Sequence, residues 1–252
     1  MPKITIVLPL SREWRVEPMR EQLETLDTEG LEVDLLVIID NHEIKLYDWP
    51  HDPRILYMDQ NHPGESNSYA RRQRIADIMN LARTNIDSDY TFILEDDTQI
   101  ESHYLQTLVS HMSTRKNVGL ISGIQAGRWA SSMNGIWKTD NIFDPHIWET
   151  LPSTPKTLKP VDATGIYCTI TPTKLFKETP FRCTYQGPDV NYGLDLRTKG
   201  YTNYADLNLT CGHVTRTKTI WPTPETGTIK FIRDDNAPGG WKQVQTTDNI
   251  TI

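Results

Sequence analysis

Three consecutive acidic residues, Glu95, Asp96 and Asp97, follow an apolar run and could together bind a cation. The run YTFIL (90–94) predicts a buried strand, so the acids stand at its carboxyl end. Residues two apart on an extended backbone face the same side, which places Glu95 and Asp97 together. Paired carboxylates suit Mg²⁺ or Mn²⁺, and such an ion usually carries phosphate oxygens. A solvated turn would explain the same triplet without any chemistry.

Two other predicted strands also end in polar residues. The apolar, β-branched runs 4–10 (ITIVLPL) and 33–41 (VDLLVIIDN) predict buried strands, and shorter ones are expected at 54–60 and 118–124. Ligands of parallel α/β sheets bind beyond the carboxyl ends of the strands. One crevice is therefore expected to collect the polar residues at these ends: Ser11, Asp40, Asn41 and the acids 95–97.

Helices are predicted between these strands, over 16–30, 62–85 and 101–113. The second is the clearest, because its apolar residues recur at helical spacing from Ile75 to Ala82, and its start is basic. Alternating strands and helices predict an α/β domain with a mostly parallel central sheet flanked by helices.

The second half of the chain has a looser pattern. Residues 126–160 are rich in Trp, Asn, Ser and Pro and predict irregular chain with short strands. A strand and a short helix are expected over 163–179, and a helix, a glycine turn and one or two strands over 187–214. We divide the chain into a domain over 1–220, with halves 1–124 and 125–220, and an extended or mobile tail over 221–252.

Composition excludes several classes of protein. The 252 residues carry a net charge of −7, which argues against a surface built wholly for nucleic acid. The three cysteines lack paired spacing and indicate reduced thiols, and C-x-H at Cys211 and His213 is too close for a usual zinc motif. No run reaches the roughly 18 apolar residues that a membrane span needs, and the first apolar run is too short for a signal peptide. We therefore expect a cytoplasmic protein.

Seven segments, in this order, resemble the GT-A fold glycosyltransferases of the large inverting family 2. They are ITIVLPL, VIIDN, GESNSYARRQRIADIMNLA, YTFILEDDTQIESHYLQTL, ATGIYCTITPTKLF, GPDVNYGLDLRTKGY and CGHV, and they span roughly residues 4 to 214. The resemblance implies a GT-A fold whose second half is a smaller, mixed β and irregular region that binds the acceptor.

The resemblance also implies a metal site and a donor site. Asp97 would be the direct metal ligand and His213 a further ligand, with Glu95 and Asp96 contacting the ribose or waters on the metal. The nucleotide pocket would be lined by Pro9, Leu10, Ser11 and Asp40, the last of which would bind the base. Arg71 or Arg72 matches the family's helix arginine, although Gln73 stands where the family has Asn. A turn residue at Asp40 and a solvated helix face at the arginines are the plainer alternatives.

A general base and a sugar-contacting segment follow from the same resemblance. Asp189 corresponds to the acid that takes the proton from the acceptor hydroxyl. Pro188 and Asn191 replace two acids that the family usually has around it, so Asp195 remains a weaker candidate. Thr164 and Gly165 would lie under the donor sugar. Helix capping for Asp189 and an ordinary glycine at 165 are the alternatives.

The activity implied is that of a metal-dependent hexosyl- or pentosyltransferase (EC 2.4 type) with Mn²⁺ or Mg²⁺ and a UDP- or GDP-linked sugar donor. The acceptor stays open among saccharides, small molecules, proteins and modified nucleic acids. A nucleotidyltransferase would normally carry a glycine-rich loop after its first strand, where this chain has LPLSREW. A non-catalytic nucleotide-sugar-binding module is the other alternative, and the altered PDVN segment favours it.

Overall fold

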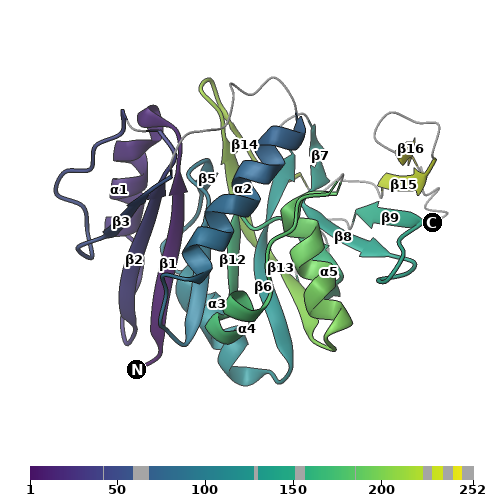
Figure 1. Cartoon of the computed structure of the whole chain (residues 1–252), viewed down its shortest axis with the longest axis horizontal. Coiled ribbons are helices and arrows are strands. Elements are labelled where there is room, and N and C mark those ends of the chain that lie inside the picture. Colours follow the sequence, from purple (N-terminus) through teal and green to yellow (C-terminus); the bar gives the residue numbers. More distant parts are fainter. Residues whose placement is uncertain are drawn as a thin grey trace.

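The computed structural model describes residues 1–41, 43–58, 68–127, 130–150, 157–184, 186–223, 229–234 and 241–245. They form an α/β fold in which helices cover both faces of a large central sheet, with a smaller sheet at one side (Figure 1). The predicted fold class is confirmed. No helix in these ranges is long and apolar enough to cross a membrane.

The central sheet has the strand order β10-β13-β6-β12-β4-β1-β2-β3. Four of the seven pairings along this path are parallel, including those of β1 with both of its neighbours. The bounds are β1 Lys3–Leu10, β2 Glu32–Ile39, β3 Arg54–Tyr57, β4 Tyr90–Leu94, β6 Val118–Gly127, β10 Leu158–Val161, β12 Cys168–Pro172 and β13 Thr202–Val214. Three short strands extend it: β5 Thr98–Gln99 and β14 Thr219–Ile220 pair with β13, and β7 Ala130–Asn134 pairs with β6.

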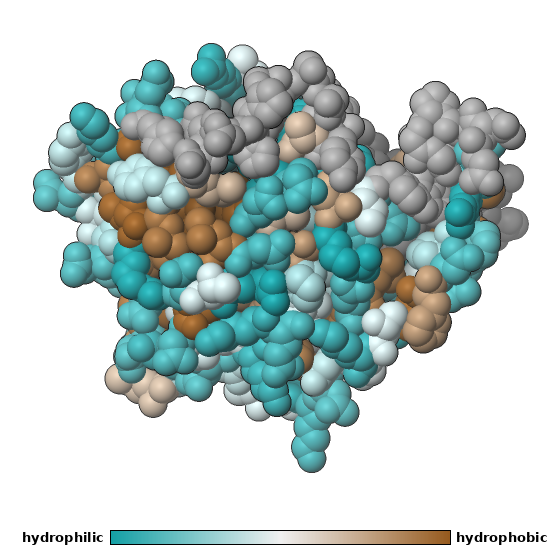
Figure 2. All heavy atoms as spheres, viewed as in Figure 1, coloured by the Kyte–Doolittle hydropathy of each residue, from teal (hydrophilic) through white to brown (hydrophobic). Residues whose placement is uncertain are grey.

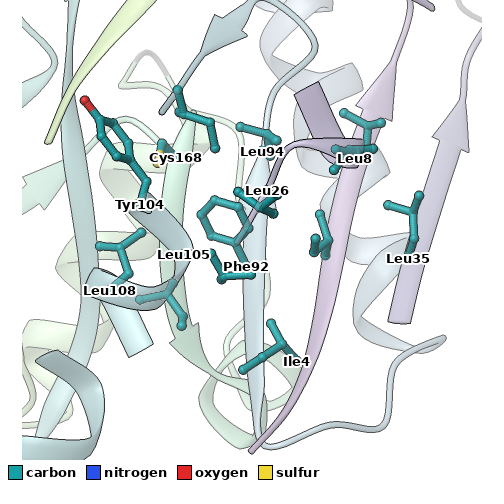
Figure 3. Close-up of a cluster of buried hydrophobic side chains, with 14 of the residues drawn as sticks. Ile4, Leu8, Leu26, Leu35, Phe92, Leu94, Tyr104, Leu105, Leu108 and Cys168 are labelled. Atoms are coloured by element: carbon teal, nitrogen blue, oxygen red, sulfur yellow. The ribbon is translucent and has the colours of Figure 1, made fainter. Parts of the chain in front are cut away.

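Two hydrophobic clusters hold the helices onto opposite faces of this sheet. The helical segments are η1 Glu13–Arg15, α1 Val16–Glu24, α2 Ser68–Arg83, α3 Tyr104–Thr114, α4 Thr173–Glu178 and α5 Pro188–Thr198. Helices α1 and α3 pack on one face, where Phe92 and Leu105 belong to a cluster that includes alternate residues of β1 (Figure 3). Helices α2, α4 and α5 pack on the other face, around Val7 and Ile93. Alternation along β1 and β4 thus supplies both clusters.

The smaller sheet has the order β11-β8-β9-β15-β16 and lies beside α5 (Figure 1). Its strands are β11 Ala163–Thr164, β8 Ile136–Thr139, β9 Ile147–Thr150, β15 Ile229–Arg233 and β16 Trp241–Gln245. The tail expected to be extended therefore contributes two strands, and β15 pairs with β9 of the region expected to hold short strands.

Helix α1 is shorter than the predicted helix over 16–30. It ends at Glu24, after which Thr25 donates its hydroxyl to the carbonyl of Gln22 and Asp27 accepts the backbone N–H of Glu29. Such side chains offer the backbone partners that compete with helical hydrogen bonds. Helix α2 begins at Ser68, and most of the segment before it, 59–67, lies outside the described residues.

Candidate active site

A tight turn and a short strand fix the acids that follow β4. The backbone N–H of Thr98 donates to the carbonyl of Glu95 at 3.0 Å, which closes the turn. Strand β5 then pairs with β13, so that Thr98 lies opposite His213. The carbonyl of Asp97 accepts the N–H of Val214 at 2.8 Å. Asp97 and His213, 116 positions apart in the chain, are thereby held next to each other by backbone hydrogen bonds.

The buried side chains of Asp97 and His213 face each other as two ligands of one ion would. The imidazole donates from Nδ1 to the carbonyl of Ala126 at 2.9 Å, which leaves Nε2 on the side of Asp97. Nε2 lies 3.4 Å from Oδ2 of Asp97. Two ligands with bonds of about 2.1 Å to one ion stand roughly 3 Å apart. The donor set therefore fits a divalent ion, although the described residues contain no ready group of three or more His, Cys, Asp or Glu side chains around one point.

Asp96 turns away from this pair and anchors the loop after β1. Its Oδ2 accepts the backbone N–H groups of Ser11 at 2.9 Å and Arg12 at 3.1 Å. The Arg15 side chain donates from Nε to the carbonyl of Asp96 at 2.6 Å. These contacts tie the end of β1 to the end of β4 and keep Ser11 at the mouth of the crevice.

Arg12 lies between the two aspartates, and sequence reasoning missed it. Its guanidinium contacts Oδ1 of Asp96 and stands 3.0 Å from Oδ2 of Asp97. The signal available in the sequence was its place, directly after β1 and one residue beyond Ser11. A cation at that strand end faces the acids at the end of the neighbouring parallel strand.

A cavity of about 400 Å³ opens between the strand ends and helix α2. It brings together most of the predicted donor-site residues, namely Pro9, Ser11, Asp40, Arg71, Arg72 and Glu95, with the predicted ligand Asp97. Asp40, Glu95 and Asp97 line it from the strand ends and arginines line it from α2, while Ile78 and Met79 supply an apolar part. Figure 2 shows hydrophobic residues gathered over β1–β3 on the face that α2 covers. Arginines suit phosphate groups, and the apolar part suits a planar base.

Asp40 lines this cavity but is also paired with an arginine that the sequence did not single out. Arg74 contacts the Asp40 carboxylate through Nε and donates from Nη2 to the Asp40 carbonyl at 3.2 Å. The pair joins the end of β2 to the first half of α2. Asn41 forms a local turn instead, in which its side-chain oxygen accepts the N–H of Glu43.

Besides Asp96 and His213, three predicted donor-site residues are not among those that line the two described cavities. Leu10 is fully buried in the cluster under α1, as alternation with Pro9 and Ser11 requires. Thr164 and Gly165 are buried as well. A side chain at Gly165 would collide with the ring of Tyr167, whose hydroxyl accepts the N–H of Gln125 at 3.0 Å. The glycine thus makes room for a core tyrosine.

A second cavity, of about 320 Å³, adjoins the first and contains Asp189. The two share Arg72, Ile75 and Glu95 as lining residues. Asp189 lies in the first turn of α5 and folds back into the space that Gly187 leaves by having no side chain. Trp137 also lines this cavity. Trp129 and the side chain of Trp148 lie outside the described residues.

Burial raises the pKa of both carboxyl groups in this second cavity. The pKa of Glu95 rises to about 8, first because of burial and then because of the charges of Asp97 and Asp189. Burial also raises the pKa of Asp189, against backbone N–H groups of α5 that lower it. Both groups therefore hold protons more tightly than exposed carboxylates do.

The weaker base candidate, Asp195, has a different environment. Arg182 binds it through two contacts, Nε to Oδ2 at 2.9 Å and Nη2 to Oδ1 at 2.6 Å. Asn191, which stands where the family has an acid, is buried and donates from Nδ2 to the carbonyl of Arg182 and the hydroxyl of Thr184. A carboxylate at position 191 would have no proton to donate to these two acceptors.

No family model and no curated protein matches this chain. Among solved structures, it is similar to the mannosyltransferase PcManGT from Pyrobaculum calidifontis in complex with GDP-Man and Mn²⁺, with a TM-score of 0.52 and 13% identity over 82% of this chain and 57% of that one. It is also similar to A197 from STIV, with a TM-score of 0.47 and 12% identity over 94% and 97% of the two chains. The sheet, the flanking helices and the likeness to the mannosyltransferase define a GT-A-like fold.

Proposed function

We propose that this protein is a glycosyltransferase that moves a sugar from a nucleotide-diphospho-sugar to an acceptor hydroxyl, with inversion. The observation that carries the proposal is the pair of adjoining cavities. One is lined by Asp97 and by the arginines of α2, the other by Asp189, and Glu95 and Arg72 line both. A donor in the first cavity and an acceptor in the second would meet at the shared residues.

The first cavity suits a nucleoside diphosphate. Arg71 and Arg72 would bind the diphosphate, and the base would lie toward Asp40 and the apolar side chains of α2. The mannosyltransferase of similar fold was solved with GDP-Man and Mn²⁺, which supports a UDP- or GDP-linked donor and a divalent ion. Asp97 and His213 would hold the ion, Mn²⁺ or Mg²⁺, and once bound it would supply Lewis-acid stabilisation of the leaving diphosphate.

Asp189 is proposed as the general base. Its carboxylate accepts the proton of the acceptor hydroxyl, and the hydroxyl oxygen attacks the anomeric carbon as the bond to the diphosphate breaks. Burial raises the pKa of this carboxylate, so it is a stronger base than an exposed one and its pKa lies closer to the working pH. Trp137 in the same cavity offers a flat face for an acceptor, whose class stays open.

The proposal is tested by a thermal-shift panel of UDP- and GDP-linked sugars, each measured with and without Mn²⁺. We expect one donor to raise the melting temperature strongly and only when Mn²⁺ is present, because a bound ligand stabilises the folded state by mass action. No shift with any donor under either condition would contradict the proposal. A donor that binds but is never hydrolysed or transferred would favour a non-catalytic nucleotide-sugar-binding module.

A further inference from the structure

The guanidinium of Arg12 stands close to the position that the proposed ion would occupy. It is 3.0 Å from Oδ2 of Asp97, and the same oxygen is 3.4 Å from Nε2 of His213. Arg12 is about one quarter exposed, at 28%, and it lines the donor cavity. One carboxylate oxygen therefore faces both a protein cation and the second proposed ligand.

We propose that Arg12 is a built-in substitute for the divalent ion, so that its guanidinium and the ion compete for the Asp97 carboxylate. The inference rests on the proposed function only in taking Asp97 and His213 as the ion's ligands. In the free protein Arg12 neutralises the acids. On ion binding it leaves Asp97 and turns into the donor cavity, where a diphosphate offers it another anionic partner.

Repulsion between two cations requires that Arg12 leave Asp97 when the ion binds there. A divalent ion on Oδ2 of the buried Asp97 would stand within a few ångströms of the guanidinium, and like charges at that separation repel strongly away from water. The site therefore favours one cation at a time beside Asp97.

The second partner of Arg12 shows that the side chain can leave without releasing the loop. Asp96 keeps its two backbone hydrogen bonds, from Ser11 and from Arg12 itself, and the Ser11 hydroxyl lies 3.3 Å from Oδ2. These bonds do not involve the guanidinium. The turn after β1 is thus held by the backbone, while the Arg12 side chain lies at the cavity.

The test is a titration of the purified protein with Mn²⁺ alone, followed by the electron paramagnetic resonance signal of the free ion. Compared are the wild type, Arg12→Gln and the control Arg20→Gln, which removes an arginine of α1 that pairs with Glu17 and Glu24. We expect Arg12→Gln to bind Mn²⁺ about tenfold more tightly or better, because the competing charge is gone. The control should bind as the wild type does. Equal or weaker binding by Arg12→Gln would overturn the proposal.

A second measurement, of melting temperatures with and without Mn²⁺, tests the proposal even if Arg12→Gln is less stable than the wild type. Arg12→Gln removes the guanidinium that contacts the buried carboxylates of Asp96 and Asp97, so its melting temperature should fall, and Mn²⁺ should restore most of the loss while shifting the wild type little. Arg12→Lys keeps a positive charge and should bind Mn²⁺ as weakly as the wild type. A melting temperature of Arg12→Gln that Mn²⁺ does not raise, or Arg12→Lys binding as tightly as Arg12→Gln, would contradict competition.

The design separates this inference from the proposed function, because no sugar donor is used. Adding Asp97→Ala to Arg12→Gln should abolish Mn²⁺ binding. If the double variant still binds the ion, the ligand assignment in the proposed function is wrong. If it does not bind but Arg12→Gln binds no better than the wild type, the ligand assignment stands and the role of Arg12 is wrong.

Discussion

Asp189 and Glu95 are carboxyl groups in partly closed surroundings, and burial raises the pKa of each. The cavity that they share is where a proton must leave an acceptor hydroxyl in the proposed reaction. A base in such a place works only once it has lost its own proton, so its raised pKa sets the lower pH limit of the reaction.

For Asp189→Asn we predict loss of transfer by about 10²-fold or more with donor binding retained, because the amide accepts no proton at working pH. In the wild type the rate should rise with pH through the raised pKa of Asp189 and then level off. Steady-state rates over a pH series check the loss of transfer and the pH profile, and donor-induced thermal shifts check that donor binding is retained. A variant that keeps the wild-type rate would move the base elsewhere.

The same substitution has an expected effect on stability. A raised folded-state pKa means that protonated Asp189 favours folding below the ordinary pKa of about 3.9, and that this contribution is lost as the pH rises through the folded-state pKa. The Asp189→Asn variant stays neutral throughout. Its melting temperature should equal or exceed that of the wild type at pH 8, with a smaller difference at pH 4. A variant clearly less stable than the wild type at pH 8 would contradict the account.

The start of α5 is the element that positions the proposed base. Gly187 leaves space for the Asp189 side chain, Pro188 occupies the first helical position, and Asn191 binds the loop that leads into the helix. The buried side chain of Asn191, about one turn into α5, therefore helps to hold Asp189 in place.

Asn191→Asp should destabilise the protein by about 2 kcal/mol or more, because a buried carboxylate would face the Arg182 carbonyl without a proton to donate. Urea unfolding at pH 7.5 measures the change. Asn141→Asp is the matched control, since Asn141 is exposed and uses its side-chain oxygen to accept the N–H of Phe143. Similar small losses in both variants would show that Asn191 is not an essential donor.

At the scale of the whole molecule, the smaller sheet packs against helix α5, which carries the proposed base Asp189. Phe231 of β15 packs against Ala163 and Leu194, the latter on α5, and Trp137 of β8 joins the same cluster. The last part of the chain thus contacts the helix that carries Asp189, while the donor cavity is lined by residues of the first hundred positions.

Phe231→Ala should cost about 1–2 kcal/mol of folding stability, because a half-buried aromatic ring is lost from this cluster. Transfer should weaken more than donor binding does, since α5 is affected and the donor cavity is not. Phe143→Ala, at a residue that is 77% exposed, is the control and should change neither quantity. Equal loss of donor binding and transfer in Phe231→Ala would contradict this division of the molecule.

Much of the fold follows from local patterns, and the rest depends on contacts across the chain. Apolar runs and helical spacing predict β1, β2, β4 and α2, and the parallel arrangement then predicts that Ser11, Asp40 and Asp97 meet. The roles of Arg12 and Arg74 depend on which carboxylates the folded chain brings beside them, so a single cationic residue in the sequence does not reveal them. The strand at 229–233 is short and joins the sheet through the distant strand β9, and the strand at 241–245 pairs with it in turn, so composition alone indicated only extended chain.

The most direct test of the central claim is release of nucleoside diphosphate from the donor that stabilises the protein, followed by chromatography in the presence of Mn²⁺. We predict slow release by the wild type without acceptor, and release at least about 10²-fold slower by Asp97→Ala, whose fold should remain intact by circular dichroism. Equal release by Asp97→Ala and the wild type, or no release from any donor by a wild-type protein that binds it, would contradict the account.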